Sequence, residues 1–272
     1  MRAGLELWAR DYGRDLVVLN DESSPQVAVG VHEQLVDQGC GPVLGPYGSD
    51  TTRAVARARD GRVVWNHGAS ADDVQRLPGV VSVATPASRY LVALAQVAAG
   101  LGALRVAVLA APGAFAGQAR KGLEHAAPSL GVELLDDATD VDCVLLCGPV
   151  EWEAERFRSL GRVGRLFGGI SPGLPHAPPV WPDGTLAPVQ WHPDLGGPPG
   201  LEDYIGAQAY AAALIAERCL ALDPSDPLSA ARSLTTHTFF GPFELDENGL
   251  QCGHRLSVVR WRHGRQTLVP AG

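Results

Sequence analysis

Stretches with helical spacing alternate with short apolar runs along the first 170 residues of this chain. Apolar side chains recur every three to four residues in 1–12 and again in 25–39, which predicts two helices. Between them, Leu16–Leu19 is a run of four apolar residues that predicts a strand. Strands that alternate with helices favour parallel sheets built from right-handed strand–helix–strand units. The chain is therefore expected to be an α/β protein.

The alternation occurs in two series, which indicates two lobes. The first series continues with strands at 42–44, 62–65 and 80–83 and a helix at 51–58. The second series begins near Pro86, with helices at 89–100, 117–127 and 151–160 and strands at 105–109, 141–146 and 165–167. After these, 171–200 is rich in proline and is expected to be irregular, and 201–220 predicts a long helix. The remainder has a hairpin signal at Asn248-Gly249, followed by a strand at 255–261.

Composition excludes several classes of function. The formal net charge is −8 and no basic patch is visible, so a nucleic-acid partner is not expected. The five cysteines have no CxxC spacing, and the eight histidines form no metal motif, so neither a cofactor nor a metal is expected. No apolar run approaches the roughly 20 residues that span a bilayer. No nucleophile–base pair is visible, which argues against an enzyme.

Two polar turns follow neighbouring strands and carry the candidate binding residues. The first, Gly45-Pro46-Tyr47-Gly48-Ser49, opens a helix, whose amino-terminal N–H groups and dipole attract anions. The second, Gly68-Ala69-Ser70, combines small residues with a hydroxyl. Ligands of open α/β sheets lie outside the carboxyl ends of the strands, so both turns indicate one site for a small carboxylate. The alternative is that the glycines only shape the turn and Ser49 caps the helix.

These motifs, in this order, resemble the leucine/isoleucine/valine-binding protein family, the substrate-binding components of branched-chain amino-acid ABC transporters. The resemblance also includes Ala207-Gln208-Ala209-Tyr210 and the closing Phe240-Gly241-Pro242-Phe243 stretch, and extends along almost the whole chain. It implies a periplasmic binding protein of type I, with two Rossmann-like lobes joined by hinge crossings. Lobe one would comprise 1–86 and 203–235, and lobe two 87–202 and 236–272.

The resemblance also implies roles for individual residues. The ligand carboxylate would be held by Ser49 and by the turn Gly68, Ala69 and Ser70, beside Tyr47. Phe115 matches an aromatic residue that covers the ligand in the family. Ile170 stands where amino-acid binders place a carboxylate for the ligand ammonium. Because a buried ammonium without a partner is costly, an acid with an apolar body is expected in preference to an amino acid, unless Glu151 provides the missing charge.

The start of the chain departs from the family pattern, because it lies inside the family's first helix. The first strand is missing, so Leu16–Leu19 and 43–44 would lack their central neighbour, and self-association through this edge is expected unless the two strands pair directly. We expect a solute-binding protein that delivers a small-molecule ligand to an ABC permease outside the cytoplasm. A cytoplasmic ligand sensor is the alternative, indicated by the absence of a signal peptide, and an α/β enzyme is a weaker one.

Overall fold

The computed structural model describes residues 1–161, 166–178 and 180–270, and it confirms the α/β class. The chain forms two compact units. Unit 1 comprises Met1–Pro86 and Leu195–Arg255, and unit 2 comprises Ala87–Asp194 and Leu256–Gly272. The chain therefore passes between the units three times, after Pro86, after Asp194 and after Arg255.

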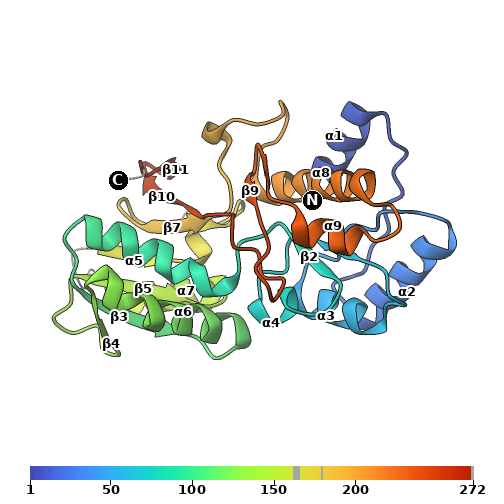
Figure 1. Ribbon diagram of the computed structural model, residues 1–272. Coiled ribbons are helices and arrows are strands. Elements are labelled where there is room, and N and C mark those ends of the chain that lie inside the picture. The colour runs from blue at the N-terminus through green and yellow to red at the C-terminus, as the bar shows by residue number, and fades with distance from the viewer. Residues whose placement is uncertain (162–165, 179, 271–272) are drawn as a thin grey trace. The chain divides into compact units, whose positions relative to one another are not determined.

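Unit 1 is a small parallel sheet with helices on both faces (Figure 1). Its strands β1 (Val64–Asn66) and β2 (Val80–Ser82) pair in parallel. Alternate residues of these strands face opposite sides. Val64 and Val80 pack against α2 (Pro25–Asp37) and α3 (Ser49–Ala58), whereas Trp65 and Val81 pack against α8 (Tyr204–Leu222) and α9 (Pro227–Ser233). The remaining elements of this unit are α1 (Arg2–Tyr12), α4 (Asp72–Gln75), β8 (Thr236–Thr238) and β9 (Gly241–Phe243).

The prediction of a strand at Leu16–Leu19 is wrong, because these residues belong to no strand in the structure. Val17 and Val18 are 47% and 41% exposed, and only Leu16 packs against the cluster formed by α1 and α8. The next expected strand is reduced to an isolated parallel bridge between Leu44 and Trp65. β-branched residues form a strand only where a neighbouring strand accepts their backbone hydrogen bonds, and the two segments do not pair with each other.

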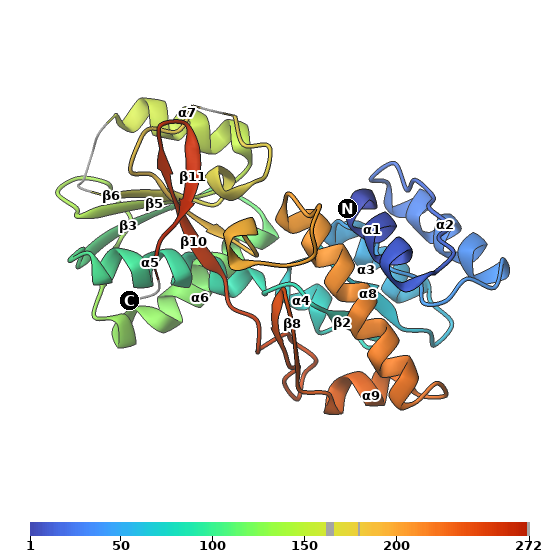
Figure 2. The same ribbon diagram turned by 90° about the horizontal axis from the view of Figure 1, so that it is seen from above.

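Unit 2 has a seven-stranded sheet with the order β11-β10-β7-β6-β5-β3-β4. Its strands are β3 (Arg105–Ala110), β4 (Glu133–Leu135), β5 (Cys143–Cys147), β6 (Leu166–Gly169), β7 (Leu186–Val189), β10 (Ser257–Arg262) and β11 (Arg265–Leu268). Its helices are η1 (Ala87–Arg89), α5 (Tyr90–Gly100), α6 (Ala114–Leu130), α7 (Val150–Leu160), η2 (Ser171–Gly173) and η3 (Pro193–Leu195), of which η3 ends in unit 1. The helices α5 and α6 cover one face of the sheet and α7 the other, as Figure 2 shows.

The proline-rich segment contains a strand that the sequence pattern concealed. β7 lies in the middle of the sheet, where it pairs with β6 in parallel and with β10 antiparallel. Pro188 lies inside this strand and cannot donate a hydrogen bond, which is why the segment was expected to be irregular. The expected strand 165–167 is observed from Leu166, and Arg165 lies outside the described residues.

The C-terminal stretch is divided between the units. Residues 236–255, expected in lobe two, cluster with unit 1, because Phe243 and Leu245 pack against Trp65 and Ala212. Residues 195–202 also belong to unit 1. Beyond Arg255 the chain enters unit 2, where β10 and β11 extend its sheet.

Helix α8 corrects the expectation that no segment is apolar enough to span a membrane. By length and composition alone, its 19 residues pass that test. However, 61% of the relevant window is buried inside the protein, where α8 contributes to the apolar cluster on β1 and β2 and to a second cluster that it forms with α1. A core helix of a globular unit explains this composition equally well, so it is weak evidence for a membrane span.

Candidate functional site

The two polar turns meet at the carboxyl edge of the unit 1 sheet. Residues 45–49 follow the bridge at Leu44, and 67–70 follow β1, which the bridge joins in parallel. The turns touch at Gly68, where an added Cβ would lie 2.2 Å from Cδ2 of Tyr47 and 2.7 Å from its backbone oxygen. Glycine is therefore required at this position by the close approach of Tyr47.

Asn66, which the sequence analysis did not single out, holds the second turn in shape. The side chain is fully buried, and its Oδ1 accepts hydrogen bonds from the amides of Gly68 (3.1 Å) and Ala69 (2.7 Å). Its Nδ2 donates to the carbonyl of Ala69 (2.8 Å) and to Oγ of Ser82 on β2 (2.9 Å). The Gly68 and Ala69 amides, which were expected to meet a ligand carboxylate, are thus already bonded within the protein.

The first turn leaves the start of α3 without a side-chain cap. Gly48 is the N-cap residue, and Ser49 is the first residue of the helix rather than its cap. The hydroxyls of Thr51 and Thr52 turn back to backbone oxygens, Thr51 Oγ1 to Gly48 at 2.9 Å and Thr52 Oγ1 to Pro46 at 3.1 Å. In the described part of the chain, the Ser49 hydroxyl has no hydrogen-bond partner. Ser49 and the first amides of α3 therefore form an anion-attracting end.

His67 lies beneath this edge, enclosed by the turns. It is fully buried, and neither ring nitrogen has a hydrogen-bond partner. The ring of Tyr47 is tilted against it, with the centroids 5.9 Å apart. Burial lowers the pKa of His67 to about 4, so the imidazole is neutral near pH 7. With so low a pKa the ring is a weak proton acceptor, and it is held between the turns by packing.

A buried amide connects the second turn to the segments that leave unit 1. Gln75 donates through Nε2 to the carbonyls of Ala84 (3.0 Å) and Ala69 (3.3 Å), and its Oε1 accepts the amide of Gln251 (3.3 Å). The Gln251 side chain in turn accepts the amide of His254 at 3.2 Å. The site turn is therefore hydrogen-bonded, through two glutamines, to residues close to the crossings at Pro86 and Arg255.

The unit 2 candidates, Phe115 and Ile170, are partly buried against the same apolar cluster. Phe115 lies in the first turn of α6 and packs edge-on against Tyr90, with centroids 5.2 Å apart. The Tyr90 hydroxyl accepts a hydrogen bond from Nε2 of Gln190 at 2.6 Å, which fixes the aromatic pair at its polar end. Ile170 follows β6 directly.

Glu153 is a buried carboxyl group beside the backbone of Ile170, and the sequence analysis missed it. It lies on α7 and is fully buried, with Oε1 accepting the amide of Gly148 (2.8 Å) and Oε2 the amide of Ser171 (2.9 Å). Glu153 therefore ties together the turns that follow β5 and β6. Burial raises its pKa to about 8, against the lowering effect of these amides. Glu151, the residue considered instead, is exposed.

The sequence contains little that distinguished Glu153 from Glu151, because both are in the first turn of the same helix. Helical spacing alone does not show which of them reaches back under the Gly148 turn. Among the described residues, no cluster of three or more His, Cys, Asp or Glu side chains is arranged to hold a metal.

The model of a protein family described as periplasmic binding protein matches residues 1–141, just over half of the chain. The chain belongs to this family. A comparison with curated protein sequences finds no significant match. The matched residues include both polar turns, and in unit 2 they include η1, α5, α6, β3 and β4.

Several solved structures share the fold at low sequence identity. A leucine-binding protein from Thermotoga maritima is 16% identical, with a TM-score of 0.78 over 99% of this chain and 92% of that one. An ABC transporter substrate-binding protein from Desulfitobacterium hafniense in complex with Leu is 17% identical, with a TM-score of 0.80 over 98% and 95%. A solute-binding protein from R. palustris in complex with benzoate is 16% identical, with a TM-score of 0.73 over 98% and 89%.

Proposed function

We propose that this periplasmic binding protein is the solute-binding component of an ABC transporter and captures a small carboxylate. The observation that carries the proposal is the uncapped start of α3, where the Ser49 hydroxyl is unengaged beside the braced turn Gly68–Ser70. Helix N–H groups and a serine hydroxyl provide the donors that a carboxylate accepts, and each hydrogen bond to a charged group contributes roughly 1.5–3 kcal/mol. The neighbours that bind leucine and benzoate are consistent with a carboxylate ligand.

We further propose that the ligand has an apolar body and no ammonium group. The residues assigned to this part of the ligand, Phe115 and Ile170, carry no charge, and Glu153 does not replace the missing anion. Both oxygens of Glu153 are occupied by backbone amides, the residue is fully buried, and its raised pKa of about 8 leaves it mainly protonated at pH 7. Aromatic or branched aliphatic acids fit this chemistry, and benzoate and hydroxybenzoates are bound by several neighbours of the same fold.

Titration calorimetry with benzoate, leucine and deaminated leucine (4-methyl-2-oxopentanoate) tests both proposals. We expect an acid without an ammonium group to bind more tightly than leucine. Ser49→Ala should weaken that binding by roughly 10- to 100-fold, since one hydrogen bond to a carboxylate is lost. Ser24→Ala, which removes a hydroxyl that caps α2, is the matched control and should leave affinity unchanged. Tight leucine binding that disappears in Glu151→Gln would contradict the assignment of an ammonium-free ligand.

A further inference from the structure

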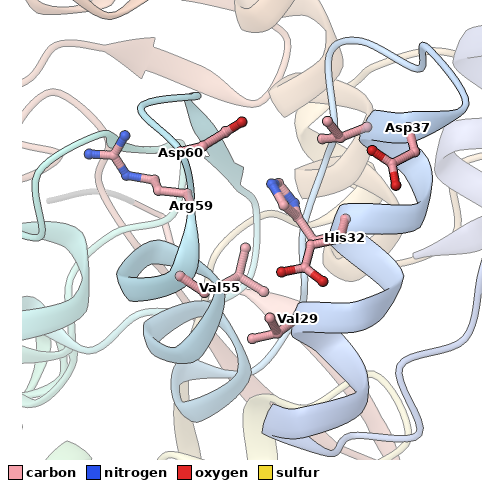
Figure 3. Close-up of a pocket in the computed structure, with 9 residues that line it drawn as sticks. Val29, His32, Asp37, Val55, Arg59 and Asp60 are labelled. Carbon is pink, nitrogen blue, oxygen red and sulfur yellow. The ribbon is translucent and has the colours of Figure 1, made fainter.

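A pocket lies in unit 1, at the opposite end of α3 from Ser49. It opens between the last turns of α2 and α3 and has a volume of about 150 Å³ (Figure 3). Helix α3 has 10 residues, so about 15 Å of helix separates its two ends. Val29, Val36 and Val55 form the apolar part of the lining. The pocket is thus separate from the polar turns, and its role is independent of the proposed carboxylate site.

His32 provides an unused polar group inside this pocket. Its side chain is only 8% exposed, neither ring nitrogen has a hydrogen-bond partner, and the ring points into the space between the two helices (Figure 3). Burial lowers its pKa, so the ring is neutral near pH 7 and presents one N–H donor and one bare nitrogen acceptor. A buried polar group of this kind requires a hydrogen-bonding partner, and a ligand with N–H groups can supply it.

The rim of the pocket is negatively charged. Glu33, Asp37 and Asp60 contribute carboxylates, and the first two have no ion pair or hydrogen bond within the described chain. Asp60 is 3.5 Å from Nε of Arg62. Among the described lining residues Arg59 is the one cation, and its guanidinium donates to the carbonyls of Pro78 and Arg62 and points away from the pocket (Figure 3).

Two helix ends add to this negative potential. The pocket is lined by the last residues of both α2 and α3, and the carbonyl end of a helix carries a partial negative charge. Helix α2 has no basic residue in its last turn, whereas Arg57 lies in the last turn of α3, so the α2 end contributes more of this potential. A bare metal ion does not suit the site, since no group of three or more metal-ligating side chains is found among the residues described. The valines instead favour a cation with an alkyl part.

We propose that this pocket binds a small organic cation, an alkylammonium or alkylguanidinium ion. Its N–H groups would be shared between the bare nitrogen of His32 and the carboxylates of Glu33 and Asp37, and its alkyl part would lie on Val29 and Val55. At about 30 Å³ for each water displaced, the volume holds on the order of five heavy atoms. n-Butylammonium has five and is therefore a suitable probe.

The test is an NMR titration of the whole chain with n-butylammonium, n-butanol and butyrate, followed through the His32 ring resonances. We expect a saturable shift with n-butylammonium alone. Asp37→Asn should weaken binding roughly two- to fivefold, as expected for one exposed charge pair. Asp15→Asn is the matched control, since it removes the same charge from an exposed position outside the pocket. His32→Phe, followed through the backbone amide resonances of α2, should abolish the interaction while leaving carboxylate binding unchanged.

Acidification provides an independent check that needs no variant. Protonation of His32 removes the acceptor nitrogen and adds a positive charge to the pocket. The charged groups around the ring are Glu33 and Asp37 on α2 and Arg59, Asp60 and Arg62, which follow α3. Affinity for n-butylammonium should therefore fall as His32 is protonated. The proposal is overturned if butanol shifts His32 as strongly as n-butylammonium does, if Asp15→Asn and Asp37→Asn weaken binding equally, or if no saturable shift occurs.

Discussion

The raised pKa of Glu153 makes the stability of unit 2 depend on pH in a calculable way. In the unfolded chain this carboxyl group titrates near its ordinary value of 4.5, whereas in the folded protein its pKa is about 8. Between these values the folded state retains a proton that the unfolded state has released. The free energy of unfolding therefore falls as pH rises through this window, by about 1.4 kcal/mol per pH unit, and by about 5 kcal/mol over the whole range.

The upper part of this window isolates Glu153 from the buried histidine. Burial lowers the pKa of His67 to about 4, so His67 makes stability rise between that value and its ordinary 6.5, and it has no effect above. From pH 6.5 to 8, Glu153 alone of these two groups titrates differently in the folded and unfolded states. It should lower the free energy of unfolding by about 2 kcal/mol across this interval.

Urea unfolding at half-unit steps from pH 6 to 9, monitored by tryptophan fluorescence, measures this effect. Glu153→Gln cannot ionise, so its stability should change by about 2 kcal/mol less than that of the wild type between pH 6.5 and 8. The variant is also expected to be less stable than the wild type at low pH. Its NH₂ group would face a backbone N–H that donates a hydrogen bond to Glu153 in the wild type, and two donors cannot bond to each other. Glu151→Gln, an exposed position on the same helix, should keep the wild-type slope. Parallel curves for wild type and Glu153→Gln would refute the reasoning.

Three further predictions concern unit 1. Asn66→Ala should lower the free energy of unfolding by about 3 kcal/mol, because it removes four hydrogen bonds and leaves the amides of Gly68 and Ala69 without their acceptor. Asn66→Asp, which keeps the acceptor, should lose less stability in chemical denaturation. Gly68→Ala should displace Tyr47 and weaken carboxylate binding, as measured by calorimetry. Gly30→Ala, with open space around the added Cβ, should instead raise the free energy of unfolding by about 0.5–1 kcal/mol in thermal denaturation. The exposed segment around Val18, which pairs with no strand, should cause concentration-dependent self-association, measurable by sedimentation velocity. Val18→Lys should reduce this association, and a strictly monomeric wild type at high concentration would contradict the prediction.

Local patterns were sufficient wherever a structural choice depends on nearby residues. The amphipathic spacing of α2, with Ser24 as its cap and Pro25 in its first turn, defined that helix closely. The buried run Cys143–Cys147 defined β5 in the same way. The order of these elements was sufficient for the α/β class. The two polar turns were also recognisable, because small and hydroxyl-bearing residues directly follow strands at both places.

Tertiary structure decided the features that depend on partners distant in the sequence. Leu16–Leu19 has strand composition but no neighbour to pair with, whereas Leu186–Val189 contains a proline and is nevertheless held between β6 and β10. Side-chain direction is likewise settled only by packing. Asn66 accepts hydrogen bonds from the Gly68 and Ala69 amides that were expected to bind a ligand. Glu153, rather than Glu151, accepts the amide of Gly148. Sequence determines which groups are present, but burial and hydrogen bonding from distant segments determine which of them remain available to a ligand.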